Sequence, residues 1–189
     1  MRVTPTAIKD VWLVQCVRHG DERGYFLETF RQEVLAAAGL DFGFVQDNES
    51  LSPEVGTVRG LHFQVPPRPQ GKLVRVVRGA VLDVAVDVRS GSPSYGQHVA
   101  VELSAEACNQ LWVPPGFAHG ICTLLPDTIL AYKVTSYWSA EHERFLRWND
   151  PALGIDWPVS ADRAVLNARD RSAPCLSELE PWPQANLKS

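Results

Sequence analysis

The stretch KLVRVVRGAVLDVAVDV, residues 72–88, decides the fold. Both halves are rich in valine and alternate as β-strands do, and the Arg-Gly pair between them predicts a hairpin turn. In the second half every second residue is apolar, which predicts that this face is buried in the core. Its members are Leu82, Val84, Val86 and Val88. The opposite face is mixed and consists of Val81, Asp83, Ala85 and Asp87.

Shorter segments of the same kind follow this hairpin. Residues 98–103, 110–113 and 129–137 are predicted strands. The 13 glycines and 14 prolines divide the chain into many short pieces, so long helices are not expected. Short strands at regular spacing predict a mainly β protein, built as an antiparallel sandwich or barrel.

One helix is predicted over residues 33–38, where the residues are good helix formers. Thr29 and Gln32 fit a capping box before it, and Gly39 is a suitable residue just past its end. Residues 1–189 are expected to form a single domain. Within it, residues 172–189 contain three prolines and few core-forming residues, and they are expected to form a surface arm.

Composition excludes several classes of protein. A chain of 189 residues that is 45% hydrophobic can bury a core without disulfides or a structural metal. The net charge of −4 argues against general nucleic-acid binding, which needs a basic face. The four cysteines have no CxxC spacing and are read as reduced thiols. No apolar run suits a signal peptide or a membrane span, so we expect a cytoplasmic protein without a membrane partner.

Two segments resemble the paired motifs of the cupin superfamily. In the first, Gly56 precedes His62 by the usual spacing, but Gln64 stands where a metal-binding cupin has its second histidine. Lys72 is separated from Gly79 by six residues and stands in the place of the usual glutamate ligand. The second segment, PPGFAH, ends at His119. An ammonium in place of a carboxylate repels a divalent cation, so the resemblance implies a jelly-roll barrel that has lost its metal.

A more specific resemblance extends from about residue 21 to about residue 174. The chain is similar to the dTDP-4-dehydrorhamnose 3,5-epimerase family through several blocks in the same order. These blocks are DERGYFLETF (21–30), QDNES (46–50), VRGLHFQ (58–64), QGKLVRVVRGAVLDVAVDVR (70–89), GSPSYG (91–96), WVPPGFAHG (112–120), the Tyr132-Lys133 pair leading to Tyr137-Trp138, and WNDPALGIDWP (148–158).

The resemblance implies a role for individual residues. The catalytic base of the family matches His62, its partner carboxylate Asp170, its acid Tyr132, and the lysine at the keto oxygen Lys72. Residues that hold the phosphates and the sugar match Arg23, Glu28, Gln46, Asn48, Arg59, His119 and Glu143. Phe26, Tyr137 and Trp138 are candidates for stacking on the nucleotide base. Arg169 stands where the family commonly has a lysine, and it can still bind phosphate.

These residue types suit an epimerisation beside a ketone. Taken alone, His62 in an apolar strand is more often structural than catalytic. In the family's pattern it would take a proton from C3 or C5 of a dTDP-linked 4-keto-6-deoxyhexose, with Asp170 fixing its tautomer. Lys72 would stabilise the resulting enolate, and Tyr132 would protonate the opposite face. This chemistry needs no cofactor. The resemblance also implies a homodimer in which N-terminal strands complete the partner's sheet.

Three alternatives stay open. The chain could epimerise a single centre or isomerise a 3,4-ketose, it could be a sugar-binding cupin without activity, or it could be a metal-dependent cupin. The missing His-x-His motif argues against the last of these.

Overall fold

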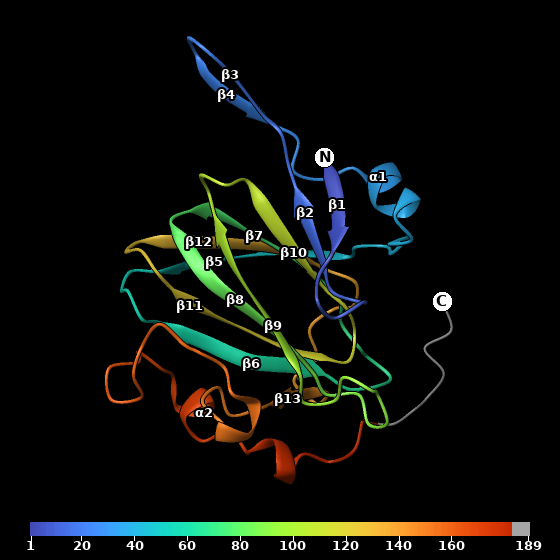
Figure 1. Ribbon diagram of the computed structural model, residues 1–189, viewed down its shortest axis with the longest axis vertical. Coiled ribbons are helices and arrows are strands. Elements are labelled where there is room, and N and C mark those ends of the chain that lie inside the picture. Colours follow the sequence, from blue (N-terminus) through green and yellow to red (C-terminus); the bar gives the residue numbers. More distant parts are fainter. Residues whose placement is uncertain (183–189) are drawn as a thin grey trace.

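The computed structural model describes residues 1–182 and shows a barrel of two antiparallel sheets (Figure 1). The predicted mainly β fold, a jelly-roll barrel with short helices, is confirmed. Within the described residues, one sheet consists of β1 (Arg2–Pro5), β2 (Trp12–Gln15), β10 (Asn109–Val113), β7 (Lys72–Arg78), β12 (Thr128–Val134) and β5 (Gln46–Ser52), in that order. The other consists of β13 (Glu143–Phe145), β6 (Val58–Gln64), β11 (Phe117–Thr123), β8 (Ala80–Asp87) and β9 (His98–Ser104).

Smaller elements lie around these sheets. β3 (Arg18–Asp21) and β4 (Gly24–Leu27) form a two-stranded arm that projects away from the barrel (Figure 1). The helices and 3₁₀ turns of the described residues are α1 (Gln32–Ala37), η1 (Pro151–Leu153), α2 (Ala168–Arg171) and η2 (Leu176–Glu178). None of the helices in residues 1–182 has the length and apolar character needed to cross a membrane.

Gly79 forms a corner between the two sheets. The predicted hairpin is wrong in its pairing, because β7 belongs to the six-stranded sheet and β8 to the five-stranded sheet. Gly79 has a φ of +85°, a left-handed conformation that side chains disfavour. A Cβ at this position would overlap the Oγ1 atom of Thr128. The chain therefore crosses from one wall of the barrel to the other at a residue that has no room for a side chain.

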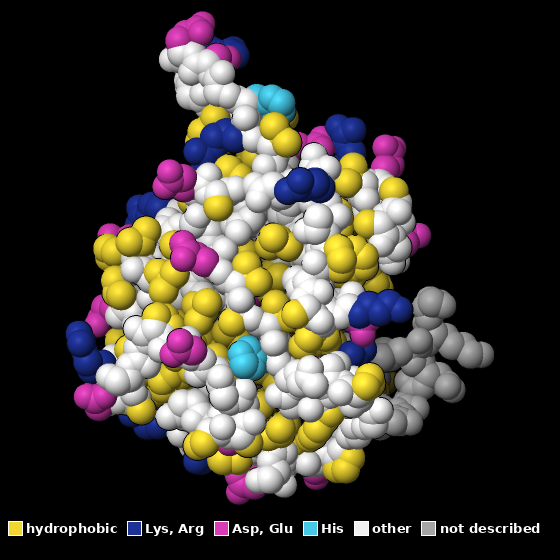
Figure 2. All heavy atoms as spheres, viewed as in Figure 1, with side chains coloured by type: hydrophobic (Ala, Val, Ile, Leu, Met, Phe, Trp, Pro, Cys, Tyr) yellow, Lys and Arg dark blue, Asp and Glu magenta, His cyan; other side chains and the backbone are white. Residues whose placement is uncertain are grey.

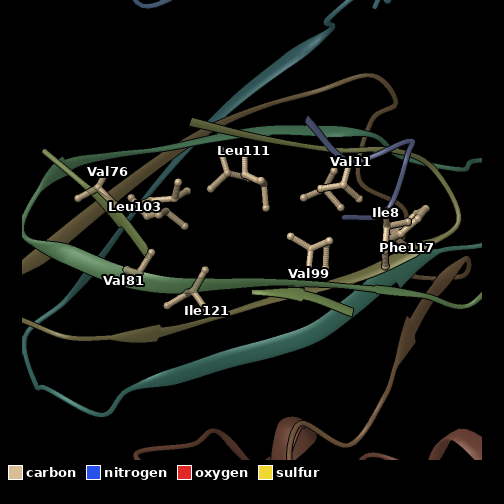
Figure 3. Close-up of a cluster of buried hydrophobic side chains, with 13 residues drawn as sticks. Ile8, Val11, Val76, Val81, Val99, Leu103, Leu111, Phe117 and Ile121 are labelled. Carbon is tan, nitrogen blue, oxygen red and sulfur yellow. The ribbon is translucent and has the colours of Figure 1, made fainter. Parts of the chain in front are cut away.

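Apolar side chains from both sheets fill the interior of the barrel (Figure 3). Val81 and Ala85 belong to this cluster, so the mixed face of β8 is the one that points inward. The buried members are Ile8, Val11, Val74, Val76, Val81, Ala85, Val99, Leu103, Leu111, Val113, Phe117, Ile121 and Leu130. The polar members of the inward face therefore lie in a largely apolar lumen.

The wholly apolar face of β8 is buried as predicted, but it packs outside the barrel. Val84, Val86 and Val88 contact the chain that follows β13, including Leu146 and Trp182. Trp182 is 5% exposed, so the part of the expected surface arm that the structure describes contributes to packing. Residues 183–189 of that arm lie outside the described residues. The five-stranded sheet is thus covered on both faces, and the single-domain interpretation stays a prediction.

The other sequence predictions differ from the structure at element ends. The strands predicted at 98–103 and 110–113 are confirmed as β9 and β10. β12 ends at Val134, three residues earlier than predicted, because the next residues bond to other segments. Thr135 N donates to the carbonyl of Gly71 at 3.1 Å, and Gln70 Nε2 donates to the carbonyl of Ser136 at 2.6 Å.

The predicted helix is present as α1, and Gly39 follows it with a φ of +83°. The predicted capping box of Thr29 and Gln32 is wrong, because Arg31 is the N-cap residue and makes no side-chain cap. The side chain of Gln32 instead donates to Asp41 at 2.8 Å. Leu35 of the helix packs on the outer face of the six-stranded sheet.

The corner at Gly79 leads to a stability prediction. We expect Gly79→Ala to lower the free energy of unfolding by about 2–4 kcal/mol, since it combines left-handed strain with a steric clash. Gly39→Ala is the matched control. Its φ is nearly the same and nothing lies within 4 Å of the added Cβ, so it should cost about 1 kcal/mol. Urea unfolding measures both, and equal losses would contradict the close contact with Thr128.

Candidate active site

The candidate site lies inside the barrel, at the end where β7 begins and β6 and β12 end. His62 of β6 is directly opposite His119 of β11 in the register of the five-stranded sheet. Across the lumen, Tyr132 of β12 packs against the interior cluster, and it is opposite Asn48 of β5 in the six-stranded sheet. The two sheets therefore bring different groups to the two walls of one site.

His62 is held by a buried carboxylate that enters from outside the barrel. Nε2 of His62 lies 2.6 Å from Oδ1 of Asp170, and Asp170 is 1% exposed. The backbone N–H of Gly60 donates to the other carboxylate oxygen at 3.2 Å. An ionised carboxylate only accepts hydrogen bonds, so it keeps the proton of the neutral ring on Nε2 and leaves Nδ1 as the basic nitrogen. The ring also packs edge-on against Phe145.

A short helix turn places this carboxylate. The side chain of Asn167 caps α2 and accepts a hydrogen bond from the backbone N–H of Asp170 at 2.8 Å. Because α2 is only one turn long, the cap fixes the position of Asp170 directly. The predicted pairing of His62 with Asp170 is thus present in the geometry, over a sequence separation of 108 residues.

Lys72 is the first residue of β7 and its ammonium lies close to His62. Nζ of Lys72 donates to the carbonyl oxygen of His62 at 3.4 Å. Burial lowers the pKa of Lys72 from 10.5 to about 8, and the carboxylates of Asp83 and Glu143 partly oppose this change. At neutral pH Lys72 is therefore a charged donor in a weakly polar lumen, where a positive charge strongly stabilises an oxyanion.

Tyr132 supplies a neutral hydroxyl from the opposite wall. Burial raises the pKa of its phenol above 10, Arg59 lowers it, and Glu143 raises it further. The phenol therefore keeps its proton at neutral pH and can donate it. His62 and Tyr132 belong to different sheets, so a ligand in the lumen would meet a base on one side and an acid on the other.

A second histidine–carboxylate pair lies beside the first. Nε2 of His119 is 2.8 Å from Oδ1 of Asp83, and both residues are buried. Burial lowers the pKa of His119, which Asp83 opposes. The sequence reasoning missed Asp83 as a site residue. The signal was present, because an acidic residue on the inward face of an otherwise apolar strand needs a partner.

Most of the predicted binding residues line or surround this lumen. Gln46 Nε2 donates to Oδ1 of Asn48 at 2.7 Å, and Oε1 of Gln46 accepts from the backbone N–H of Trp138 at 3.2 Å. Arg59 is oriented by a hydrogen bond from Nε to Oγ of Ser52 at 3.0 Å. At the edge of the site, a guanidinium nitrogen of Arg169 lies 3.7 Å from a carboxylate oxygen of Glu143. The side chains of Tyr137 and Trp138 are exposed.

Three predicted binding residues are not brought to this site. Arg23 and Phe26 lie on the projecting arm, and Glu28 follows it. Arg23 pairs with Asp21 and Glu28 pairs with Arg31, while Phe26 is 70% exposed. Figure 2 shows the arm standing clear of the body, with charged side chains at its tip.

Gln64, which stands where a metal-binding cupin has a histidine, bonds to the segment before β7 and to the segment after β12. Its Nε2 donates to the carbonyls of Arg68 and Tyr137, and its Oε1 accepts from the backbone N–H of Ser139. Across residues 1–182 no group of three or more histidine, cysteine or acidic side chains is arranged to hold a metal ion. The metal-free character of the site stays a prediction.

The fold and the site together define a class of protein. A cupin-type barrel whose lumen holds an oriented imidazole, an ammonium and a phenol on opposing walls is built to move protons at carbon next to a carbonyl. That is the chemistry of an isomerase.

The comparisons with known proteins identify the family. A family model described as dTDP-4-dehydrorhamnose 3,5-epimerase matches residues 5–178. The dTDP-4-dehydrorhamnose 3,5-epimerase of Sinorhizobium fredii is 57% identical over 173 residues, which cover 92% of this chain and 88% of that protein. The chain belongs to the dTDP-4-dehydrorhamnose 3,5-epimerase family, as the sequence blocks predicted.

Two solved structures support this result. The dTDP-6-deoxy-D-glucose-3,5-epimerase of Legionella pneumophila, in complex with dTDP-4-keto-L-rhamnose, superposes with a TM-score of 0.91 at 41% identity, covering 97% of this chain and 99% of that one. The dTDP-4-dehydrorhamnose 3,5-epimerase of Bacillus anthracis, with TDP and PPi bound, gives a TM-score of 0.88 at 46% identity, covering 92% and 98%.

The environment of Lys72 leads to a prediction about pH. We expect kcat/KM for epimerisation to fall as the pH rises through about 8, because Lys72 then loses its charge. Lys72→Arg keeps the charge at higher pH, so the alkaline limb of its profile should move to higher pH even if its maximal rate is lower. If the alkaline limb of kcat/KM lies at the same pH in both proteins, a group other than Lys72 causes the loss of activity.

Proposed function

We propose that this chain converts dTDP-4-dehydro-6-deoxy-D-glucose into dTDP-4-dehydro-L-rhamnose by inverting C3 and C5. The observation that carries the proposal is the placement of His62 and Tyr132 on the two opposing sheets, with Lys72 at the same end of the lumen. Inversion at carbon requires removal of a proton from one face and delivery of a proton to the other. The family membership and the ligand of the Legionella structure support this substrate.

In the proposed mechanism, Nδ1 of His62 takes the proton from the carbon next to the C4 ketone. The electron pair of the C–H bond moves to the C4 oxygen and forms an enolate, which the ammonium of Lys72 stabilises. The buried carboxylate of Asp170 stabilises the imidazolium that results. Tyr132 then protonates the same carbon from the opposite face, and the ketone forms again. Before the next inversion, the imidazolium of His62 releases its proton to water and the phenolate of Tyr132 takes one up. All steps are proton transfers, so the reaction needs no redox cofactor, and the ammonium of Lys72 supplies the positive charge that a metal ion could otherwise bring to the oxygen.

Substrate binding is assigned to the remaining polar residues around the lumen. We assign contacts with the sugar to His119, Gln46 and Asn48, and contact with a phosphate to Arg59. Arg169 lies beside Glu143 with an exposed guanidinium, and we assign to it a bidentate contact with the pyrophosphate. The exposed rings of Tyr137 and Trp138 provide surfaces on which the thymine base can stack. The cytoplasmic location expected from the sequence is also part of the proposal.

We also propose that the protein acts as a homodimer in which the β3-β4 arm of one copy completes the site of the other. Phe26 belongs to β4 and Arg23 to the turn between β3 and β4, and this arm projects away from the barrel of its own chain (Figures 1 and 2). It also exposes Tyr25 and Phe26, which are 61% and 70% accessible. Apolar rings on a projecting ribbon are suited to burial against another protein surface. If the arm enters the lumen of the partner, Arg23, Phe26 and Glu28 contact the substrate that is bound there.

The reaction can be tested by isotope exchange. We expect the wild-type protein, incubated with dTDP-4-dehydro-6-deoxy-D-glucose in D2O, to incorporate deuterium at both C3 and C5, measured by NMR. His62→Asn should lower the rate of exchange by about 10²–10⁴-fold, the usual contribution of a general base. Tyr132→Phe should allow exchange but hinder inversion. Deuterium at C3 alone would favour a single-centre epimerase, and its absence from both carbons would favour a sugar-binding protein.

The sharing of the arm can be tested by mixing two inactive variants. Arg23→Ala removes an arm residue and His62→Asn removes the base. If the arm acts on the partner, a mixed dimer keeps one intact site, and random exchange of subunits should restore about a quarter of the wild-type activity. If the arm acted on its own chain, both sites of the mixed dimer would be damaged and no activity would return. Light scattering on each variant checks that the dimer itself is retained.

A further inference from the structure

Asp83 has no role in the mechanism above, yet it lies within the same lumen. It is fully buried on the inward face of β8, and Oδ1 contacts His119. Its second oxygen, Oδ2, has no hydrogen-bond partner among the described residues. It is the sole buried side-chain nitrogen or oxygen atom of those residues without one. An unpaired oxygen on a buried carboxylate is costly, so a structural role alone does not account for it.

The surroundings of Asp83 explain what this charge can do. Lys72 of β7 lies among Asp83 of β8, Glu143 of β13, and the imidazoles of His62 and His119. Both carboxylates favour the charged form of Lys72, and Asp83 has the larger effect. Glu143 is 17% exposed in its side chain and lies near the guanidinium of Arg169, so water and a second cation weaken its field. The side chain of Asp83 is completely shielded from solvent.

The contact with His119 adds a second effect. A carboxylate accepts hydrogen bonds and does not donate them when ionised, so Oδ1 keeps the proton of the neutral ring on Nε2. Because burial lowers the pKa of His119, the ring is neutral near pH 7 and its Nδ1 carries no proton. The bond therefore sets both the orientation and the tautomer of the ring.

We propose that Asp83 is a positioning residue of the active site, which fixes the ring of His119 through one oxygen and whose remaining negative charge favours the ammonium form of Lys72. This rests on the proposed function, in which Lys72 faces the C4 oxygen. In this proposal Asp83 acts through His119 and Lys72 and takes no part in the proton transfers themselves. Its negative charge favours the protonated form of Lys72, and that ammonium then stabilises the enolate.

The decisive variant is Asp83→Asn, which keeps the shape of the side chain and removes its charge. Without the carboxylate, the pKa of Lys72 should fall below its value of about 8. The alkaline limb of kcat/KM should therefore move down by about one pH unit, the size of effect expected for a neighbouring charge. Near pH 6 the variant should recover a larger fraction of wild-type activity than at pH 8. An unchanged limb would overturn the proposal.

Asp127→Asn is the matched control. It also removes one negative charge, but from an exposed turn whose partner is Arg78. Asp127 has a φ of +50°, a conformation that asparagine tolerates well, so the fold should be retained. Its pH profile should match that of the wild type.

A second measurement is independent of activity. Competitive acetylation of amines with acetic anhydride, quantified at Lys72 by mass spectrometry, reports its pKa directly. We expect the half-point of labelling to shift to lower pH in Asp83→Asn and to stay in place in Asp127→Asn. Binding of dTDP, measured by calorimetry, should be unchanged in Asp83→Asn, which also shows that the variant is folded. If the wild type fails to exchange deuterium at C3 and C5, the proposed function fails. If the wild type does exchange deuterium but the pKa of Lys72 is the same in Asp83→Asn, only the role of Asp83 is rejected.

Discussion

The contact between His62 and Asp170 is the constraint on which the rest of the site depends. The carboxylate belongs to a segment that lies outside the barrel, and it reaches the ring only because that segment is packed firmly against β6. Leu61 and Phe63, the neighbours of His62 on the other face of the strand, are buried in that same outer layer. Neighbouring side chains of a strand point to opposite faces. When Leu61 and Phe63 pack in the outer layer, the side chain of His62 between them therefore points into the lumen.

The two histidine–carboxylate pairs of the lumen look alike but are not equivalent. Asp170 has hydrogen bonds to both oxygens, from His62 and from the backbone N–H of Gly60. Asp83 has a bond to one oxygen, from His119. A fully bonded carboxylate is a firm support for a base that must become positively charged. A partly bonded carboxylate projects more of its charge onto its surroundings, which here include the ammonium of Lys72.

Much of the site could be predicted from the sequence because the family blocks are local. The segments around His62, Lys72 and His119 carry their own spacing, and the structure places all three in one lumen. The placement of β7 and β8 in different sheets could not be predicted, because Arg78-Gly79 suits a hairpin turn and a corner equally well. The close contact of Gly79 with Thr128, which accompanies the corner, is not visible in the local sequence. The inward face of β8 was also missed. The alternation of β8 shows that its wholly apolar face is buried, but it does not tell whether that face lies inside or outside the barrel, and here it lies outside. The placement of Arg23 and Phe26 away from the lumen likewise depends on the direction of the arm, which no local pattern specifies.

The apolar filling of the barrel has a consequence for catalysis as well as for stability. His62 and Tyr132 are attached to separate sheets, and the side chains packed between those sheets act as a spacer that sets the gap a sugar ring must fit. Close-packed interiors transmit small changes in volume to their surroundings. In the proposed mechanism, the same valines and leucines that keep the chain folded therefore also set the distance between the base and the acid.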